Sequence, residues 1–194
     1  MTANRQQLPI ITFLVIFVVG FICGVVFSVY KLGPTSNETA QKDPHVTEQK
    51  QELGQAISQL EQEVQADPEN YQTWVNLGHL YFDTGQNEKA IDAYLTSLKY
   101  HDGNADLLTD LGVMYRRSGQ PEKAVEWFDK AQQMDAQHQP SRFNEGIVRI
   151  YDLEDTEGGL ASWEELLKIN PDFANRNGQK LQELVDQMKS SLNK

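Results

Sequence analysis

A set of apolar residues and glycines recurs along this chain at a fixed spacing of 34 positions. The first set is Trp74, Leu77, Gly78, Tyr81, Gly85, Ala90 and Tyr94, and the second is Leu108, Leu111, Gly112, Tyr115, Gly119, Ala124 and Phe128. A unit this short cannot bury its own apolar face, so its copies must stack into a solenoid that presents an extended surface. The repeat therefore indicates recognition rather than catalysis.

Each copy contains two helices joined by a tight turn. Trp74, Leu77 and Tyr81 lie three and four positions apart, which places them on one face of an amphipathic helix. Residues 83–87 read as a turn in which Gly85 suits a positive φ. The second helix then carries Ala90 and its neighbours toward the first.

These residues resemble the tetratricopeptide repeat, a helix–turn–helix unit of 34 residues. The resemblance covers roughly residues 47–194 and implies an all-α, right-handed helical solenoid of about eight helices. In the third copy Arg142, Glu145 and Arg149 replace the aromatic, Leu and Tyr, and one inserted residue makes the period 35. The expected units are a half-repeat or capping helix over 47–67, repeats over 71–104 and 105–138, a degenerate repeat over 139–173, and a C-terminal capping helix over 174–194.

The first part of the chain has a different composition. An apolar stretch without charge runs from Ile10 to Tyr30, and as a helix it would span roughly 30 Å, the hydrocarbon thickness of a bilayer. We expect a head over 1–8, a transmembrane anchor over 9–31 and a flexible linker over 32–46. The alternative is a cleaved signal peptide ending near Ser28, although its apolar core would be shorter, at about 7–15 residues.

The charges that flank the apolar stretch indicate its orientation only weakly. Arg5 precedes the stretch, and Lys31 and Lys42 follow it. The short head and the long acidic domain favour a single-pass protein of the inner (cytoplasmic) membrane with its repeats in the periplasm. Gly20, Gly24 and Ser28 share one helix face on which two such helices could form a homodimer, although glycine is frequent in membrane helices in any case.

Charge and cysteine content exclude several function classes. The first 44 residues hold three basic and two acidic residues, so 14 basic and 26 acidic residues remain, a net charge of −12. Such a domain repels phosphate backbones, and nucleic acid is not expected as a partner. Cys23 is the sole cysteine of the chain, which rules out an intramolecular disulfide.

The sequence shows no pattern typical of catalysis or metal binding. The four histidines, His45, His79, His101 and His138, have no partner at metal-ligand spacing. The acidic run 152–158 lacks the glycine and the bidentate Glu of a calcium loop. We therefore expect no enzyme, no cofactor and no metal site.

In the tetratricopeptide family the first helix of each repeat lines a concave groove, and the resemblance implies which residues face it. The predicted groove set is Gln72, Asn76, His79, Phe82, Asp83, Asp106, Thr109, Asp110, Val113, Arg116, Arg117, Phe143, Asn144, Ile147, Ile150 and Tyr151. Asn76, Asp110 and Asn144 are equivalent positions and would form a ladder that hydrogen-bonds the backbone of an extended peptide. The alternative is a solvated polar helix face. The apolar half of the site is expected in the third repeat.

Five residues bear on the choice of partner. Family members that clamp a C-terminal carboxylate use Lys and Asn in the first repeat and Lys and Arg in the third. Val75, His79, Pro140 and Asn144 stand at those places here, so that function is not supported. Trp127 lies beside the aromatic position of its repeat and is a candidate exposed anchor for another protein.

The leading hypothesis is a membrane-tethered adaptor or scaffold that binds a protein or extended peptide in its groove and assists assembly of an envelope complex. One anchor followed by a small tetratricopeptide domain is a layout similar to that of cytochrome c biogenesis accessory proteins, a likeness of layout alone. The alternative is a structural scaffold that self-associates through the glycine face of the anchor or by stacking of solenoids.

Overall fold

The computed structural model describes residues 44–192, with side chains from residue 48 onward. The chain divides into two compact units, Met1–Glu48 and Gln49–Lys194, and the repeats lie in the second. The predicted head, the predicted anchor with its Gly20, Gly24 and Ser28 face, and linker residues 32–43 fall outside the described part. None of the helices within residues 44–192 is long and apolar enough to cross a bilayer.

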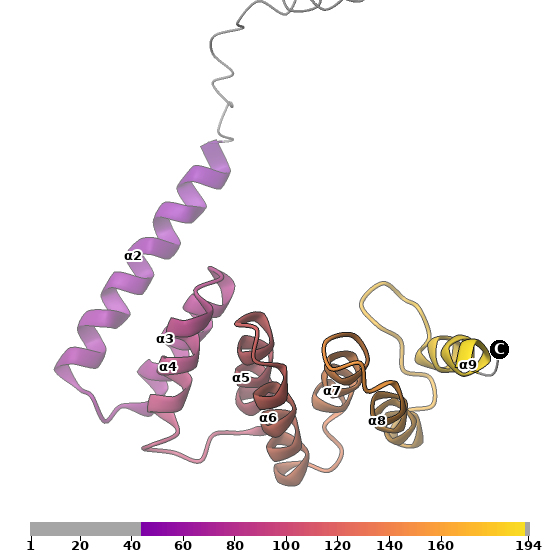
Figure 1. Cartoon of the computed structure of the whole chain (residues 1–194). Helices are drawn as coiled ribbons and strands as arrows, with labels where there is room; N and C mark the ends of the chain where they lie inside the picture. Colours follow the sequence, from indigo (N-terminus) through magenta and orange to yellow (C-terminus); the bar gives the residue numbers. More distant parts are fainter. Residues whose placement is uncertain (1–43, 193–194) are drawn as a thin grey trace, which may run out of the picture. The chain divides into compact units, whose positions relative to one another are not determined.

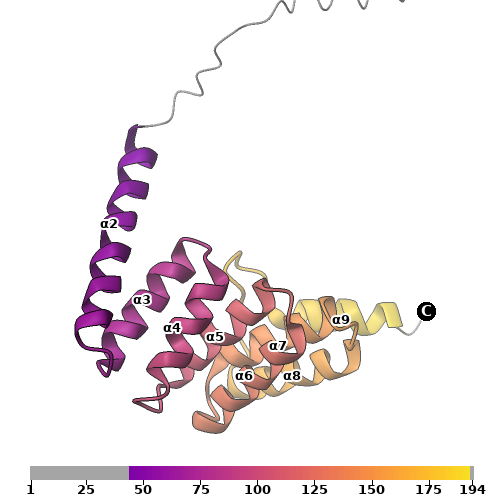
Figure 2. The ribbon, with the colours of Figure 1, turned by 60° about the vertical axis from the view of Figure 1, so that its left-hand side comes forward.

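Residues 44–192 form eight α-helices and make an all-α helical solenoid (Figure 1). They are α2 (Pro44–Ala66), α3 (Tyr71–Asp83), α4 (Asn87–Ser97), α5 (Ala105–Arg117), α6 (Pro121–Met134), α7 (Gln139–Tyr151), α8 (Thr156–Ile169) and α9 (Leu181–Leu192). From α3 onward each helix packs against the next in chain order, as both views show (Figures 1 and 2). Since α3, α5 and α7 begin at residues 71, 105 and 139, the period of the sequence is also the period of the helices.

Equivalent side chains cap the first helix of every repeat. The side-chain oxygens of Asn70 and Asn104 accept the backbone N–H groups of Thr73 and Leu107, at 3.3 and 2.8 Å. Such caps satisfy amide groups that have no partner within the helix. His138 holds the same position before α7, and its Nδ1 accepts the Ser141 N–H at 3.3 Å.

The turns between paired helices depend on a residue with positive φ. Gly85 and Gly119 adopt φ values of 71° and 72° in the first two repeats. The third repeat places Glu154, with φ 57°, at the corresponding point. Glu154 follows Gly119 by 35 residues, because one residue is inserted in the third repeat. The positive-φ position of this turn is thus held by a glutamate rather than a glycine, although L residues rarely adopt that conformation.

Each repeat is closed by an aromatic ring that packs on a glycine. The ring comes from the second helix and the glycine from the first, and a Cβ on that glycine would lie 2.2 to 2.5 Å from the ring. The pairs are Gly78 with Tyr94, Gly112 with Phe128, and Gly146 with Trp163. The three rings are almost fully buried, so the absence of a side chain on the glycine sets the distance between paired helices.

The degenerate repeat replaces apolar contacts with a polar network. Glu145 occupies the place of Leu77 and Leu111, yet it is only 5% exposed. Its two carboxylate oxygens accept hydrogen bonds from Arg149 Nε at 2.6 Å and from Gln132 Nε2 at 2.7 Å. A buried charge is tolerated when it is paired and hydrogen-bonded, so the third unit keeps the fold of a repeat without its apolar consensus.

Both ends of the repeat domain differ from the sequence prediction. Helix α2 begins at Pro44 rather than at residue 47, with proline at the first helical position, where its missing N–H is harmless. The C-terminal cap is not helical from residue 174, because a hairpin over 173–181 comes first and α9 begins only at Leu181. Leu181 and Val185 of α9 are buried and cover the last repeat.

Trp127 is not the free anchor that the sequence suggested. It is half-buried and packs against the core of the first two repeats. Its ring lies parallel to that of Tyr115, with centroids 6.4 Å apart. The Lys130 ammonium lies over the Trp127 ring, 3.7 Å from its centroid. These contacts assign Trp127 to packing between helices α5 and α6.

Candidate peptide-binding groove

The first helices of the repeats and the C-terminal hairpin surround a hollow of about 690 Å³, which we call the central hollow. Its lining residues from α3, α5 and α7 are Phe82, Asp106, Thr109, Asp110, Val113, Arg117, Pro140, Phe143 and Asn144. All of these except Pro140 belong to the predicted groove set. The hollow lies on the side formed by the first helix of each repeat, so it is a groove in the solenoid rather than a gap between paired helices.

The other wall of the central hollow is the C-terminal hairpin, residues 173–181. Phe173, Ala174, Asn175, Arg176 and Asn177 line the hollow from this side. The hairpin is held by backbone hydrogen bonds, including Leu181 N–H to Phe173 O and Asn175 N–H to Gln179 O, both at 2.9 Å. Sequence reasoning missed this wall, although Asn177-Gly178 is a dipeptide typical of hairpin turns.

Asp106 and Asp110 lie one turn apart on α5 and face the groove together. The Asp106 side chain is 82% exposed, and its Oδ1 lies 3.0 Å from Nε2 of the buried His138. Because His138 Nδ1 accepts the Ser141 N–H, the hydrogen-bond network assigns the ring proton to Nε2. His138 thus donates its Nε2–H to Oδ1 of Asp106 and orients the carboxylate.

Asp110 lies deeper in the groove than Asp106. Its Oδ2 is 3.6 Å from Nδ1 of His79, which is also 2.8 Å from the hydroxyl of buried Tyr94. Burial raises the pKa of Asp110 above its ordinary value of 3.8, and the charges of Asp106 and Asp83 raise it further, whereas His79 and Arg117 oppose the shift. The ionised carboxylate is therefore poorly compensated in the free protein.

The third repeat and the hairpin supply the apolar part of the central hollow. The half-buried rings of Phe143 and Phe173 are 5.2 Å apart. Phe143 is also stacked on Trp163, at 6.0 Å, and its carbonyl accepts the indole N–H of that residue at 3.1 Å. Across the groove, the Arg117 guanidinium lies over the Phe82 ring at 4.7 Å from its centroid. Pre-positioned rings of this kind suit an apolar side chain of a ligand.

A second hollow, of about 450 Å³, continues from Asp106 toward the first repeat. Gln72 and His79 of the predicted set line it, beside the stacked rings of Tyr71 and His101, whose centroids are 4.2 Å apart. Asp106 is common to both hollows. The second hollow therefore adjoins the central hollow at the Asp106 carboxylate.

Six predicted groove residues line neither hollow: Asn76, Asp83, Arg116, Ile147, Ile150 and Tyr151. Arg116 is paired with Asp152, with a 3.3 Å contact between Nη2 and Oδ1. Ile150 is buried, because Gly159 on α8 lacks a side chain and lets Ile150 pack directly on that helix. Ile147 packs in the same apolar cluster, and Tyr151 is 61% exposed. Of the apolar half expected in the third repeat, Phe143 alone lines a hollow.

Thr109 lines the central hollow, but its side chain is buried and its hydroxyl proton is already used within α5. The residue is 5% exposed, and its hydroxyl donates to the Ala105 carbonyl at 2.8 Å. In the predicted amide ladder, Asn144 Nδ2 donates to the Pro140 carbonyl at 2.8 Å, and Asn76 Oδ1 accepts from Gln72 at 3.1 Å. Asn144 and Asp110 therefore remain candidate peptide contacts, while Asn76 stands outside both hollows.

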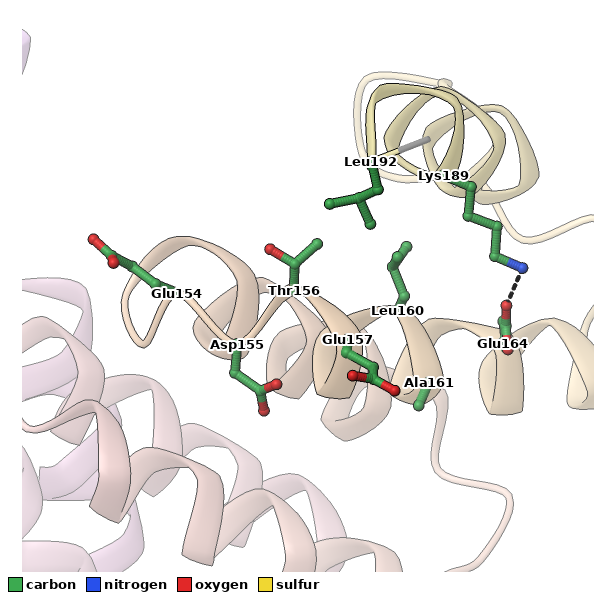
Figure 3. Close-up of a pocket in the computed structure, with 9 residues that line it drawn as sticks. All are labelled: Glu154, Asp155, Thr156, Glu157, Leu160, Ala161, Glu164, Lys189 and Leu192. Atoms are coloured by element: carbon green, nitrogen blue, oxygen red, sulfur yellow. Dashed lines mark ion pairs between the residues drawn. The ribbon is translucent and has the colours of Figure 1, made fainter. Parts of the chain in front are cut away.

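A further hollow, of about 700 Å³, lies between α8 and α9 (Figure 3). Leu192 and Lys189 reach from α9 toward Leu160 and Glu164 of α8, and Lys189 and Glu164 form an ion pair. Asp155 at its edge is occupied as the cap of α8, since it accepts the Gly158 N–H at 2.9 Å. We interpret this hollow as the seam between the last repeat and its cap.

Residues 48–192 contain no group of three or more His, Asp or Glu side chains placed to hold a metal ion. The polar side chains that line the central hollow are carboxylates, amides and arginines beside aromatic rings, groups that can hydrogen-bond a peptide.

Comparison with known proteins agrees with this geometry. Residues 48–97 and 75–138 match the sequence profile of the tetratricopeptide repeat. The described domain accordingly has the fold of a tetratricopeptide-like helical solenoid. Repeats of this kind are generally non-catalytic scaffolds for protein interaction.

Three known proteins illustrate the likeness. The chain is 27% identical over 145 residues to anaphase-promoting complex subunit 3 of Schizosaccharomyces pombe, a match over 75% of this chain and 22% of that protein. The chain thus spans about a fifth of the length of this curated relative.

Two solved structures share the fold. The crystal structure of MamA superposes with a TM-score of 0.61 at 21% identity, covering 65% of this chain and 73% of that one. The first tetratricopeptide domain of Spaghetti (RPAP3), bound to the HSP90 peptide SRMEEVD, gives 0.56 at 20% identity, covering 66% and 97%. At these identities the likeness establishes the fold alone.

Proposed function

We propose that this chain is a membrane-tethered adaptor whose tetratricopeptide domain binds an extended segment of another protein in the central hollow. The observation that carries the proposal is the hollow itself. Side chains from α3, α5 and α7 converge there with a hairpin wall, and the aromatic rings and polar groups that line it are already held in place by their own contacts. Preorganisation of this kind lowers the entropy lost on binding.

Fold relatives support the proposal as analogy. The Spaghetti domain is bound to an HSP90 peptide in its solved structure. We do not propose a clamp for a C-terminal carboxylate, because Val75, His79, Pro140 and Asn144 stand where such a clamp would have its Lys, Asn, Lys and Arg residues. The present groove instead places two carboxylates, Asp106 and Asp110, at its centre.

The location and the assembly role belong to the same proposal. The apolar stretch Ile10 to Tyr30 has the length of a membrane-spanning helix. A tethered adaptor meets its partner at the membrane surface, where effective concentration compensates for modest affinity. We propose in addition that the domain lies in the periplasm and assists assembly of an envelope complex.

The proposal is tested by photo-crosslinking from defined positions of the full chain in its native membrane. A photoreactive residue replaces Asn144 in the central hollow or, as a control, exposed Glu126 on α6. We expect specific adducts from position 144 only. Adding Val113→Arg, which fills the hollow with a long charged side chain, should abolish them.

Two results would overturn the proposed function. One is an identical set of adducts from positions 144 and 126, and the other is a set from position 144 that survives Val113→Arg. Fractionation of the same cells tests the anchor, because an anchored chain stays with membranes washed in alkaline carbonate whereas a released one does not.

A further inference from the structure

The proposed function leaves the chemistry of the bound segment open, and the charges in the groove bear on it. No Lys or Arg nitrogen within residues 48–192 comes within 4.0 Å of Asp106 or Asp110. Their close partners are the imidazoles of His138 and His79. By contrast, Asp152 and Glu145 are each paired with an arginine. Within the described residues, neither groove carboxylate is therefore in direct contact with a lysine or arginine, and Arg117 acts on Asp110 only from a distance.

The surroundings of the two carboxylates fit a cation rather than a chance surface charge. His138 is buried and donates to Asp106 from a position that its own capping bond holds in place. Asp110 is two-thirds shielded, with only 34% of its side chain exposed. A cation placed between these carboxylates would relieve both the desolvation of Asp110 and the repulsion from Asp106.

The apolar groups of the hollow lie at a different place along it. Phe143 comes from α7 and Phe173 from the C-terminal hairpin, whereas Asp106 and Asp110 lie on the first half of α5. A ligand that uses both regions must carry a cationic and an apolar side chain at separate positions. The two regions together would fix the register of an extended peptide.

Building on the proposed function, we infer that the central hollow selects an extended peptide segment in which a Lys or Arg is followed or preceded at short range by a large apolar residue. The basic side chain lies between Asp106 and Asp110, and the apolar side chain packs on Phe143 and Phe173. The net charge of −12 on the repeat domain steers such a cationic segment toward the groove.

The opposite chemistry, an acidic segment, is the main competitor. Arg117 and Arg176 also line the central hollow. Arg117 lies over the Phe82 ring, two turns beyond Asp110 on α5, and its charge opposes the rise in the pKa of Asp110. Arg176 lies on the exposed hairpin. Neither arginine comes within 4.0 Å of Asp106 or Asp110, so neither neutralises these carboxylates by direct pairing.

The experiment is selection of random short peptides displayed on phage against the full chain in non-ionic detergent, followed by affinity measurement on synthetic peptides. We expect the selected peptides to be enriched in Lys or Arg at a fixed distance from Phe, Leu or Met. Exchange of the basic residue for norleucine should weaken binding about tenfold, and exchange for Glu should weaken it more.

Variants of the protein separate the two contacts. Asp106→Asn with Asp110→Asn should remove the enrichment of basic residues while the apolar preference remains. Phe173→Leu should weaken the apolar preference while the basic one remains. Asp92→Asn, on the exposed surface of α4, is the matched control and should change neither.

The outcomes distinguish this inference from the proposed function. Selected peptides that are acidic, or that show no charge preference, would overturn the inference and leave the groove as a peptide site. Basic peptides whose binding is unchanged in the Asp106→Asn, Asp110→Asn variant would also overturn it. If no peptide is selected at all and photo-crosslinking from position 144 finds no partner, the proposed function fails as well.

Discussion

Arg149 donates its Nε–H to Oε1 of buried Glu145 at 2.6 Å, one helical turn away on α7. In the two preceding repeats the same positions hold a leucine and a tyrosine. Glu145→Ala should lower the free energy of unfolding by about 2 kcal/mol, because it leaves the donors of Arg149 and Gln132 without their acceptor. Urea denaturation followed by circular dichroism measures the change, with exposed Glu126→Ala as the control.

A triple substitution at the same site tests whether the polar network can be replaced by apolar residues. Arg142→Leu, Glu145→Leu and Arg149→Tyr together restore the pattern of repeat 2, Leu108, Leu111 and Tyr115. Since a buried ionic group is often replaced by apolar residues without loss of stability, the triple variant should be at least as stable as the natural chain. A triple variant less stable than Glu145→Ala would contradict this account of the degenerate repeat.

Gly112→Ala should lower the free energy of unfolding by about 2 kcal/mol. The added Cβ would lie 2.5 Å from the Phe128 ring, which is fully buried and cannot move aside. Gly54→Ala is the matched control, because nothing lies within 4 Å of a Cβ at that exposed helical position. It should stabilise the chain by up to about 1 kcal/mol through helix propensity. Equal effects of the two changes would show that ring-on-glycine packing does not set the helix spacing.

Glu154→Gly should raise the free energy of unfolding by about 1 kcal/mol, because it relieves the positive φ of 57° in the turn of the third repeat. The reverse change in the preceding repeat, Gly119→Ala, should lower it by a similar amount. A Cβ on Gly119 meets no atom within 4 Å, so backbone conformation alone is tested there. Thermal melts of the two variants check the pair, and changes of the same sign would refute the correspondence between residues 154 and 119.

Asp110→Asn should raise the melting temperature at pH 7 while it weakens peptide binding. The pKa of Asp110 in the folded chain is raised above 3.8, mainly by burial. Its contribution to stability is thus fully present below pH 3.8 and is lost as the pH rises through the raised value. The gain of the variant over the natural chain should therefore be largest at neutral pH and disappear at pH 3.

Melting curves across that range provide the check, with Asp92→Asn as the control. A variant that is less stable than the natural chain at pH 7 would show that the Asp110 carboxylate stabilises the fold. Greater stability combined with weaker binding would instead identify a residue retained for recognition at the expense of stability.

The sequence by itself determined the repeating part of the fold. The 34-residue period and its apolar spacing predicted paired helices, and α3, α5 and α7 begin at that period. These features are local, because helical periodicity, turn glycines and small residues at close contacts act within about one repeat. For the same reason, three of the polar residues predicted for the groove, Asp106, Asp110 and Asn144, line the central hollow.

The tertiary structure alone decided how the groove is completed. His138 meets Asp106 across 32 residues of chain, and Phe173 meets Phe143 only because the C-terminal hairpin folds back over α7. It also decided that Ile150 is buried and that Glu145 is compensated by Gln132 from another helix. Such pairs depend on how far each helix approaches its neighbour, and that distance is set by the packing of the whole stack rather than by any one repeat.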